Sequence, residues 1–198
     1  MKLLVFIILF CISLFANDKY SVRAMAGKVT MSDFSEIMVL NWQGHPYDLK
    51  VYSVDGGYQL AKDYKQLPLD FYLKSSLSYY DEDGYKDNIY ELTLYFKAYW
   101  SFFGKKMRFG LGEGVSYTSG VLTTEYLEAS EEGDFNSKFL NYLDVSLDVD
   151  LGKMFNYKAL DELYIGWGLK HRSGIFGLIN NVKRGGSNYN CIYIEKNF

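Results

Sequence analysis

Apolar and polar residues alternate with a period of two along much of this sequence. The clearest case is residues 138–152, where Leu143, Val145 and Leu147 share one parity while the other parity carries aspartates. A period of two is that of a β-strand, whose successive side chains point to opposite faces. Carboxylates along one face indicate a polar, filled interior behind an apolar exterior.

Eight segments show this alternation clearly or in a weaker form. They are residues 20–31, 47–61, 67–80, 88–103, 107–119, 138–152, 162–174 and 188–198. The polar parity of the fifth segment is mostly glycine and hydroxyl residues, which suit a narrow lumen. The sequence therefore predicts an all-β fold, an eight-stranded antiparallel outer-membrane β-barrel.

The connections between these segments alternate in length. Those at 62–66, 104–106 and 153–160 are on average shorter than those at 32–46, 81–87, 121–137 and 174–187, which are rich in Asp, Glu, Asn and Gly. Short periplasmic turns and longer external loops are typical of barrels in the bacterial outer membrane. Because eight strands enclose only enough room for their own side chains, we do not expect a diffusion pore.

The composition agrees with this fold. The chain has 19 Tyr, 14 Phe and 3 Trp but only 2 Pro. Tyr and Trp gather at membrane boundaries, and Pro is excluded from hydrogen-bonded strands. On composition alone, a soluble β-sandwich remains an alternative.

The first 16 residues have the pattern of a signal peptide. Lys2 precedes an unbroken apolar run that is shorter than the roughly 20 residues of a membrane-spanning helix. We expect residues 1–16 to be removed and residues 17–198 to form one barrel domain. Cys11 would leave with the signal, so Cys191 would remain alone and no internal disulfide is expected.

The charge and the motifs exclude several classes of function. Without Lys2 the chain has 20 basic and 24 acidic residues, a net charge of 20 − 24 = −4. It therefore lacks the basic footprint of a nucleic-acid-binding protein. It also lacks a phosphate loop, a dinucleotide motif and a Cys/His cluster, so we expect no cofactor and no metal site.

In the seventh segment, ELYIGWGLKHRSG at 162–174, the row of alternate apolar residues ends in two polar ones. Leu163, Ile165, Trp167 and Leu169 lead into His171 and Ser173, which should therefore project from the outer wall. Lys170 and Arg172 share the opposite parity, so they should point inward. There we expect three aspartates of the neighbouring segment to neutralise them, namely Asp144, Asp148 and Asp150.

A histidine and a serine two residues apart on one strand face can act together. Their backbones lie about 7 Å apart, which side chains can close. A neutral imidazole can take the serine proton and make the hydroxyl a nucleophile towards an ester. The alternative is that polar residues simply reappear where the strand leaves the hydrocarbon.

The stretch HRSGIFGLINNVKRGGSNY resembles the PagL-like lipid A deacylases, most sharply in about the last 40 residues. The resemblance implies an esterase that removes an ester-linked acyl chain from lipid A, with lipopolysaccharide in the outer leaflet as its partner. It implies His171 as general base and Ser173 as nucleophile. The acyl chains would lie against the wall of Leu163, Ile165, Trp167 and Leu169, and a homodimer is compatible with this plan.

The chain departs from the family where a glutamate should orient the histidine. Residues 174–194 contain no Asp or Glu, and the expected position falls near Gly185. An amide can also hold an imidazole tautomer. Asn180, Asn181 and Asn188 are therefore candidates, and we predict Asn188.

An oxyanion hole could come from loop glycines. Backbone N–H groups can stabilise the charge that develops on an ester oxygen. The candidates are Gly174, Gly177, Gly185 and Gly186, which could equally be plain turn residues.

Two further residues and two further functions stay open. Glu113 would face lipid in mid-strand, at a cost of about 2 kcal/mol or more near the midplane. Either a local bulge turns it inward or it lies close to the outer boundary. His45 should be an ordinary loop residue. The alternatives to an esterase are a non-catalytic small barrel with a structural or adhesive role, and an inactive relative of the deacylases.

Overall fold

The computed structural model describes residues 19–32, 36–37, 41–183 and 185–198. The expected signal peptide, with Cys11, lies outside the described residues. The strands are β1 (Tyr20–Val29), β2 (Lys50–Ala61), β3 (Leu69–Asp81), β4 (Ile89–Phe102), β5 (Met107–Thr118), β6 (Phe139–Asp150), β7 (Leu163–Ser173) and β8 (Ser187–Asn197).

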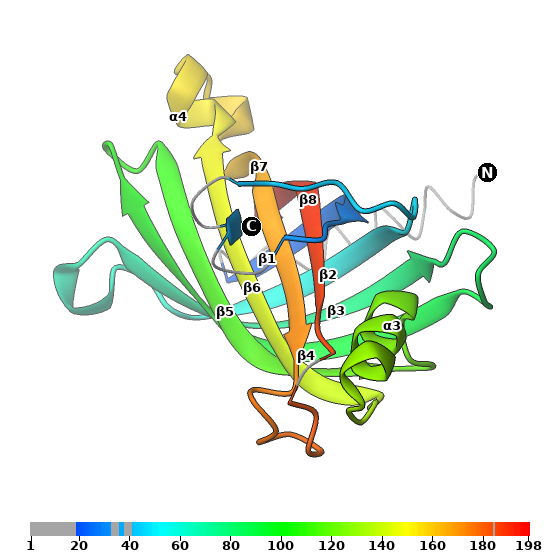
Figure 1. Ribbon diagram of the computed structural model, residues 1–198. Coiled ribbons are helices and arrows are strands. Elements are labelled where there is room, and N and C mark those ends of the chain that lie inside the picture. The colour runs from blue at the N-terminus through cyan, green and yellow to red at the C-terminus, as the bar shows by residue number, and fades with distance from the viewer. Residues whose placement is uncertain (1–18, 33–35, 38–40, 184) are drawn as a thin grey trace, which may run out of the picture.

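These strands form one closed antiparallel barrel in chain order, in which β8 pairs back with β1 (Figure 1). The predicted eight-stranded antiparallel barrel is confirmed. Each strand end lies within three residues of its predicted position.

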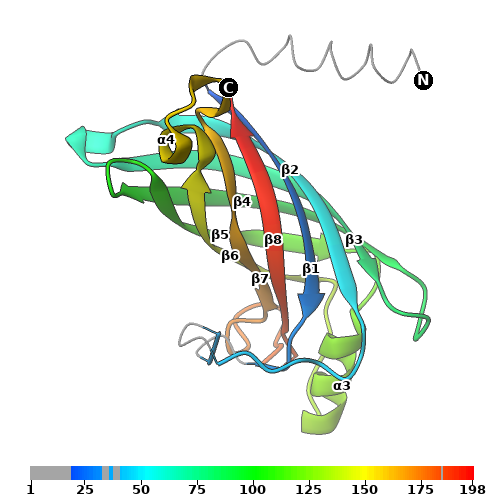
Figure 2. The ribbon, with the colours of Figure 1, turned by 90° about the horizontal axis from the view of Figure 1, so that it is seen from above.

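The two ends of the barrel differ. Figure 2 shows the C-terminus and α4 (Leu151–Phe155) at one end, with α3 (Thr123–Glu132) and the β7–β8 loop at the other. Two 3-10 helices, η1 (Tyr64–Gln66) and η2 (Lys158–Leu160), lie in the β2–β3 and β6–β7 connections. We call the end with the longer connections the loop end, which faces outward in barrels of this kind.

Helices replace parts of the predicted loops and of one strand. The alternation of the sixth segment runs on to residue 152, but β6 ends at Asp150, whose side chain accepts a hydrogen bond from the Lys153 N–H at 3.0 Å. This cap starts α4. No helix among the described residues is long and apolar enough to cross a membrane.

The barrel wall exposes large apolar side chains on several adjacent strands. They include Val54, Leu77, Leu92, Leu94, Phe96, Leu111, Ile165 and Ile192. A continuous apolar band of this kind is unfavourable in water and favourable against acyl chains. The exterior therefore fits a barrel of the bacterial outer membrane.

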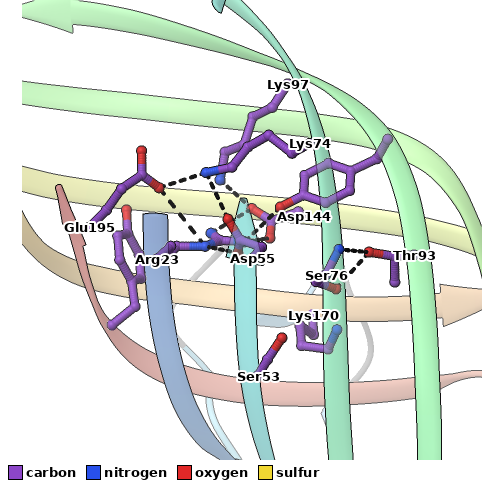
Figure 3. Close-up of polar contacts among 12 residues, drawn as sticks. Arg23, Ser53, Asp55, Lys74, Ser76, Thr93, Lys97, Asp144, Lys170 and Glu195 are labelled. Atoms are coloured by element: carbon purple, nitrogen blue, oxygen red, sulfur yellow. Dashed lines mark hydrogen bonds and ion pairs between the residues drawn. The ribbon is translucent and has the colours of Figure 1, made fainter. Parts of the chain in front are cut away.

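The lumen is filled by charges that pair across it. Among the described residues, six buried cations pair with six buried carboxylates: Arg23, Lys74, Lys97, Arg108, Lys170 and Arg172 with Asp55, Glu91, Glu125, Asp144, Asp148 and Glu195. Figure 3 shows Arg23 bound to both Asp55 and Asp144, at 2.5 and 2.6 Å. A buried charge needs such a partner, because it cannot recover its hydration inside the barrel.

Tyrosines fill the remaining space in the lumen. Eight are almost fully buried: Tyr72, Tyr80, Tyr95, Tyr99, Tyr142, Tyr164, Tyr189 and Tyr193. Several hydroxyls bond to the charges; Tyr99, for example, donates to Glu195 at 2.9 Å. The glycine face of β5 makes room for them, since a Cβ added to Gly112 would lie 2.9 Å from the Tyr95 ring. Many tyrosines thus serve the interior rather than the membrane boundary.

Lys170 and Arg172 face the lumen as predicted, but the predicted aspartate partners are wrong. Lys170 Nζ lies 2.8 Å from Glu91 and Arg172 Nη1 lies 2.5 Å from Glu125. The three aspartates are held by other cations, Asp144 by Arg23 and Lys97, Asp148 by Arg108, and Asp150 by Lys153. Lys170 reaches across the lumen to β4 and Arg172 reaches α3, so the partners of these two residues do not come from the adjacent strand.

Asp144→Asn should destabilise the barrel strongly. Arg23 and Lys97 would lose a buried counter-charge, and removing one partner of such a pair costs about 3–5 kcal/mol. Denaturant unfolding in detergent micelles measures the free energy of unfolding. The matched variant Asp63→Asn removes a carboxylate from an exposed pair with Lys105 and should change little. Equal decreases in the free energy of unfolding for the two variants would contradict a stabilising role for the charge pairs of the lumen.

Candidate active site

His171 and Ser173 project from the outer face of β7 near the loop end, as the parity of the sequence predicts. Both side chains are half-buried. In the β6–β7 register His171 stands opposite Leu143 and Ser173 opposite Asn141. The pair therefore lies on the lipid-facing side of the wall.

Asn188 of β8 stands directly opposite His171 in the β7–β8 register. Its Oδ1 lies 2.7 Å from His171 Nδ1, and its Nδ2 donates to the Ser32 carbonyl at 3.1 Å. The carbonyl can only accept, so it fixes which end of the amide faces the imidazole. His171 Nδ1 therefore carries the proton and donates it to Asn188, and in the neutral ring Nε2 is the nitrogen that can accept a proton.

Gly186 lies against both members of the pair. A Cβ added to this glycine would be 3.8 Å from His171 Cε1 and 3.8 Å from Ser173 Cβ, and 2.8 Å from the Arg172 carbonyl. Only glycine leaves this space open. The Gly186 N–H donates to Glu128 of α3 at 2.9 Å, which holds the loop in place.

Arg172, between the two residues, anchors the strand from the lumen side. Its guanidinium donates to Glu125 of α3 and to Ser116 of β5, at 2.5 and 2.8 Å. Glu125 also accepts from the Ser187 hydroxyl at 2.9 Å. The charged residue of the HRS stretch is thus structural, and it fixes the backbone on which His171 and Ser173 stand.

Asn141 is a site neighbour that sequence reasoning missed. It shares the outward parity of β6 and is 7% exposed beside Ser173. In the sequence it reads as one polar residue within an apolar face. Only the register of β6 against β7 brings this residue opposite the serine.

The segment between β1 and β2 covers part of the wall that was expected to hold acyl chains. Ile37 is fully buried against Val145 and Leu169, and Trp42 stacks on Trp167 with ring centroids 5.7 Å apart. In Figure 1 the light blue part of this segment crosses in front of β7 and β8. Leu169 is therefore not available to a lipid chain, contrary to the expectation from the sequence.

Three other candidates lie away from His171 and Ser173 or serve the loops. Asn180 donates to Ser137 Oγ and to the Phe139 carbonyl, each at 2.9 Å, and so ties the β7–β8 loop to the start of β6. Asn181 has a left-handed backbone in the same loop, with φ 58°. The His45 Nδ1 accepts the Tyr47 N–H at 3.1 Å, a local loop contact.

Glu113 faces outward on β5. The register of β5 with β4 and β6 runs without a shift, opposite Phe96 and Leu143, so the bulge that could have turned it inward is absent from these strands. Leu143 separates Glu113 from His171 in the same row of residues. Glu113 is therefore a lipid-facing carboxylate two strands from the histidine.

No group of three or more His, Cys, Asp or Glu side chains that could hold a metal ion is found in the described part of the chain. Cys191, the cysteine of the barrel itself, is free and buried.

The two histidines should carry their protons on opposite nitrogens. We expect Nδ1–H for His171, which donates to Asn188, and Nε2–H for His45, whose Nδ1 accepts from a backbone N–H. Nitrogen-proton correlation NMR of histidine-labelled protein at alkaline pH reports both tautomers, and His45→Gln assigns the signals. Burial lowers the pKa of His45 and favours its neutral form. An Nε2–H tautomer at His171 would contradict the role given to Asn188.

A scan against protein-family models finds no match, and no curated protein matches the sequence. Among solved structures, the barrel is similar to the outer membrane enzyme PagL, with a TM-score of 0.61 and 14% identity over 90% of this chain and 99% of that chain. It is also similar to Neisserial surface protein A, with a TM-score of 0.47 and 13% identity over 90% and 97%, respectively. For the outer membrane protein Ail of Yersinia pestis the TM-score is 0.43, with 7% identity over 89% and 99%. The similarity to PagL shows the fold, an eight-stranded barrel of the outer-membrane type.

Proposed function

We propose that the protein is an outer-membrane esterase that removes an ester-linked acyl chain from lipid A. The observation that carries the proposal is the chain of contacts from the Ser32 carbonyl through Asn188 to His171, beside Ser173 on the lipid-facing wall. An oriented imidazole next to a serine is the arrangement of a nucleophilic hydrolase. Its place on the wall makes a membrane lipid the natural substrate.

The reaction follows from this geometry. Ser173 Oγ attacks the ester carbonyl while His171 Nε2 takes the hydroxyl proton. The tetrahedral intermediate collapses, the carbon–oxygen bond to the sugar breaks, and His171 returns the proton to the leaving alkoxide. Water, deprotonated by His171, then hydrolyses the acyl-serine and releases a fatty acid. Asn188 keeps the imidazole in the tautomer that each step needs.

Asn141 is our candidate for stabilising the oxyanion. A side-chain amide can donate to the developing charge as a backbone N–H does. The N–H of Gly177 already donates to Val182 and that of Gly186 to Glu128. The remaining loop candidates are Gly174 and Gly185. Gly174 directly follows Ser173, which stands opposite Asn141.

The structural similarity to the enzyme PagL supports this proposal at the level of the fold. The resemblance of HRSGIFG to the PagL-like deacylases adds the roles of His171 and Ser173. An amide takes the place of the glutamate of that family, and Asn188 occupies the position behind the imidazole.

One observation favours a second candidate, a non-catalytic adhesive barrel. Phe176 and Leu178 on the β7–β8 loop are 93% and 82% exposed. Exposed apolar side chains at a loop end are suited to binding another surface. Under this alternative Ser173→Ala would leave function intact.

Expression of the protein in cells with a defined lipid A should remove one ester-linked acyl chain, seen by mass spectrometry as a loss of that chain's mass. Ser173→Ala should abolish the loss. His171→Ala should slow it by about 10²–10⁴-fold, the usual contribution of a general base. Asn188→Ala should have a smaller effect than His171→Ala.

The control is His45→Ala, which removes the other histidine from an external loop and should leave the lipid A change intact. Unchanged lipid A in cells whose membranes contain folded, unmutated protein would sink the esterase proposal.

Asn141→Ala should lower kcat by about 10²–10³-fold with little change in KM, as for loss of one oxyanion donor. Deacylation of purified lipid A in detergent measures both constants. Asn88→Ala is the matched control. Asn88 lies in the β3–β4 connection and donates to Tyr79 of β3, away from His171 on β7. A change in KM alone would assign Asn141 to substrate binding instead.

A further inference from the structure

A groove of about 480 Å³ lies on the outer wall beside the candidate site. It crosses β8, β1 and β2, and its main lining side chains are Ala26, Trp42, Tyr52, Trp167, Asn190 and Ile192. Most of this lining is apolar or aromatic. The groove is thus suited to an apolar chain.

The groove begins next to the residues of the proposed reaction. Asn190 follows Asn188 on the outer face of β8, about 7 Å along the strand. Further along, Trp167, Ile192 and Ala26 stand in one row across β7, β8 and β1. The groove therefore runs from the His171–Asn188 pair towards the middle of the wall.

The wall directly below His171 is closed. Ile37 covers Leu169 and Val145, and the Trp42 indole donates to the Ile37 carbonyl at 3.3 Å. Trp42, stacked on Trp167, separates this covered wall from the groove. A lipid chain next to the site thus meets the β1–β2 segment on one side and an apolar channel on the other.

Two polar atoms of the groove residues are buried without a hydrogen-bond partner among the described residues, the donor Trp167 Nε1 and the acceptor Asn190 Oδ1. The two residues are diagonal neighbours on β7 and β8. Such neighbours lie about 7–8 Å apart. One amide group can bridge this spacing, because its N–H donates to the asparagine and its carbonyl accepts from the indole. An ester offers no donor and leaves the asparagine oxygen unpaired.

Ion pairs mark the outer end of the groove. Lys28 and Lys50, both at its edge, each contact Asp48 at 2.6 Å. Their hydrogen bonds hold the pKa of the Asp48 carboxyl at about 2. Charges of this kind belong at headgroup level rather than in the hydrocarbon. A chain in the groove therefore has its head near the lysines and its tail towards Ala26.

We propose that this groove holds an amide-linked acyl chain of the same lipid whose ester-linked chain is cleaved at Ser173, with the amide bridging Trp167 and Asn190. The inference rests on the proposed function for the identity of the lipid. The groove selects a substrate that carries an amide-linked chain next to the ester. It also orients that lipid so that the neighbouring ester faces His171.

The test uses two probes that differ only in one linkage, which carries an N–H in the amide and an oxygen in the ester. One is an N-acyl glucosamine phosphate whose chain ends in a diazirine, and the other is its O-acyl ester counterpart. Each is mixed into liposomes that hold full-length protein with Ser173→Ala, so that no probe is consumed. Irradiation followed by mass spectrometry of peptides compares labelling of β1, β2 and β8 with labelling of the β4 wall, which reports ordinary lipid contact.

The amide probe should label the groove strands about tenfold more than the ester probe, a difference of about 1.4 kcal/mol. Ala26→Trp, which fills the groove, should abolish this labelling, whereas Ala98→Trp on the outer face of β4 should not. Trp167→Phe keeps a ring against Trp42 but removes the donor, so it should erase the preference for the amide.

Equal labelling by both probes, or labelling spread evenly over the wall and insensitive to Ala26→Trp, would overturn the groove proposal. Because labelling is measured without turnover, the two proposals fail separately. A barrel that labels as expected but never deacylates lipid A keeps the groove and loses the esterase. A barrel that deacylates lipid A but labels evenly keeps the esterase and loses the groove.

Discussion

The pairing of buried charges across the lumen is the interaction on which the rest of this structure depends. An eight-stranded barrel has almost no room for water inside, so each cation must find a carboxylate. Arg23 alone ties β1 to β2 and β6 through Asp55 and Asp144. The charges are thus paired inside the lumen, and the exterior can be apolar. Because the lumen is filled, residues that act on a lipid must lie on the outer wall.

Arg172 connects this interior to the candidate site. Its side chain is bound in the lumen and at α3, while its backbone sits between His171 and Ser173. The two outward side chains therefore stand on a segment that is held from behind. Such support is what a site on a thin wall needs, since a strand bent by thermal motion would separate a base from its nucleophile.

Much of the fold could be predicted from the sequence, because a period of two records which side each residue faces. The same parity put His171 and Ser173 outside and Lys170 and Arg172 inside. It could not predict the partners of Lys170, since contacts across the lumen depend on barrel closure and side-chain length. Asn141 could not be predicted for a related reason: only the register between two strands brings it opposite Ser173. Asn188 was one of three candidate asparagines, and the register sets it opposite His171.

The contact between Asn188 and Ser32 has a consequence for biogenesis. The His171 imidazole comes from β7, its amide partner from β8, and the carbonyl that orients the amide from the segment after β1. The first and last strands meet only when the barrel closes. Before the barrel closes, the exported chain contains all these residues, but they do not make these contacts. The proposed esterase would therefore be inactive during export and become active when β1 pairs with β8 in the target membrane. Lipids that the chain meets before that point would not be cleaved.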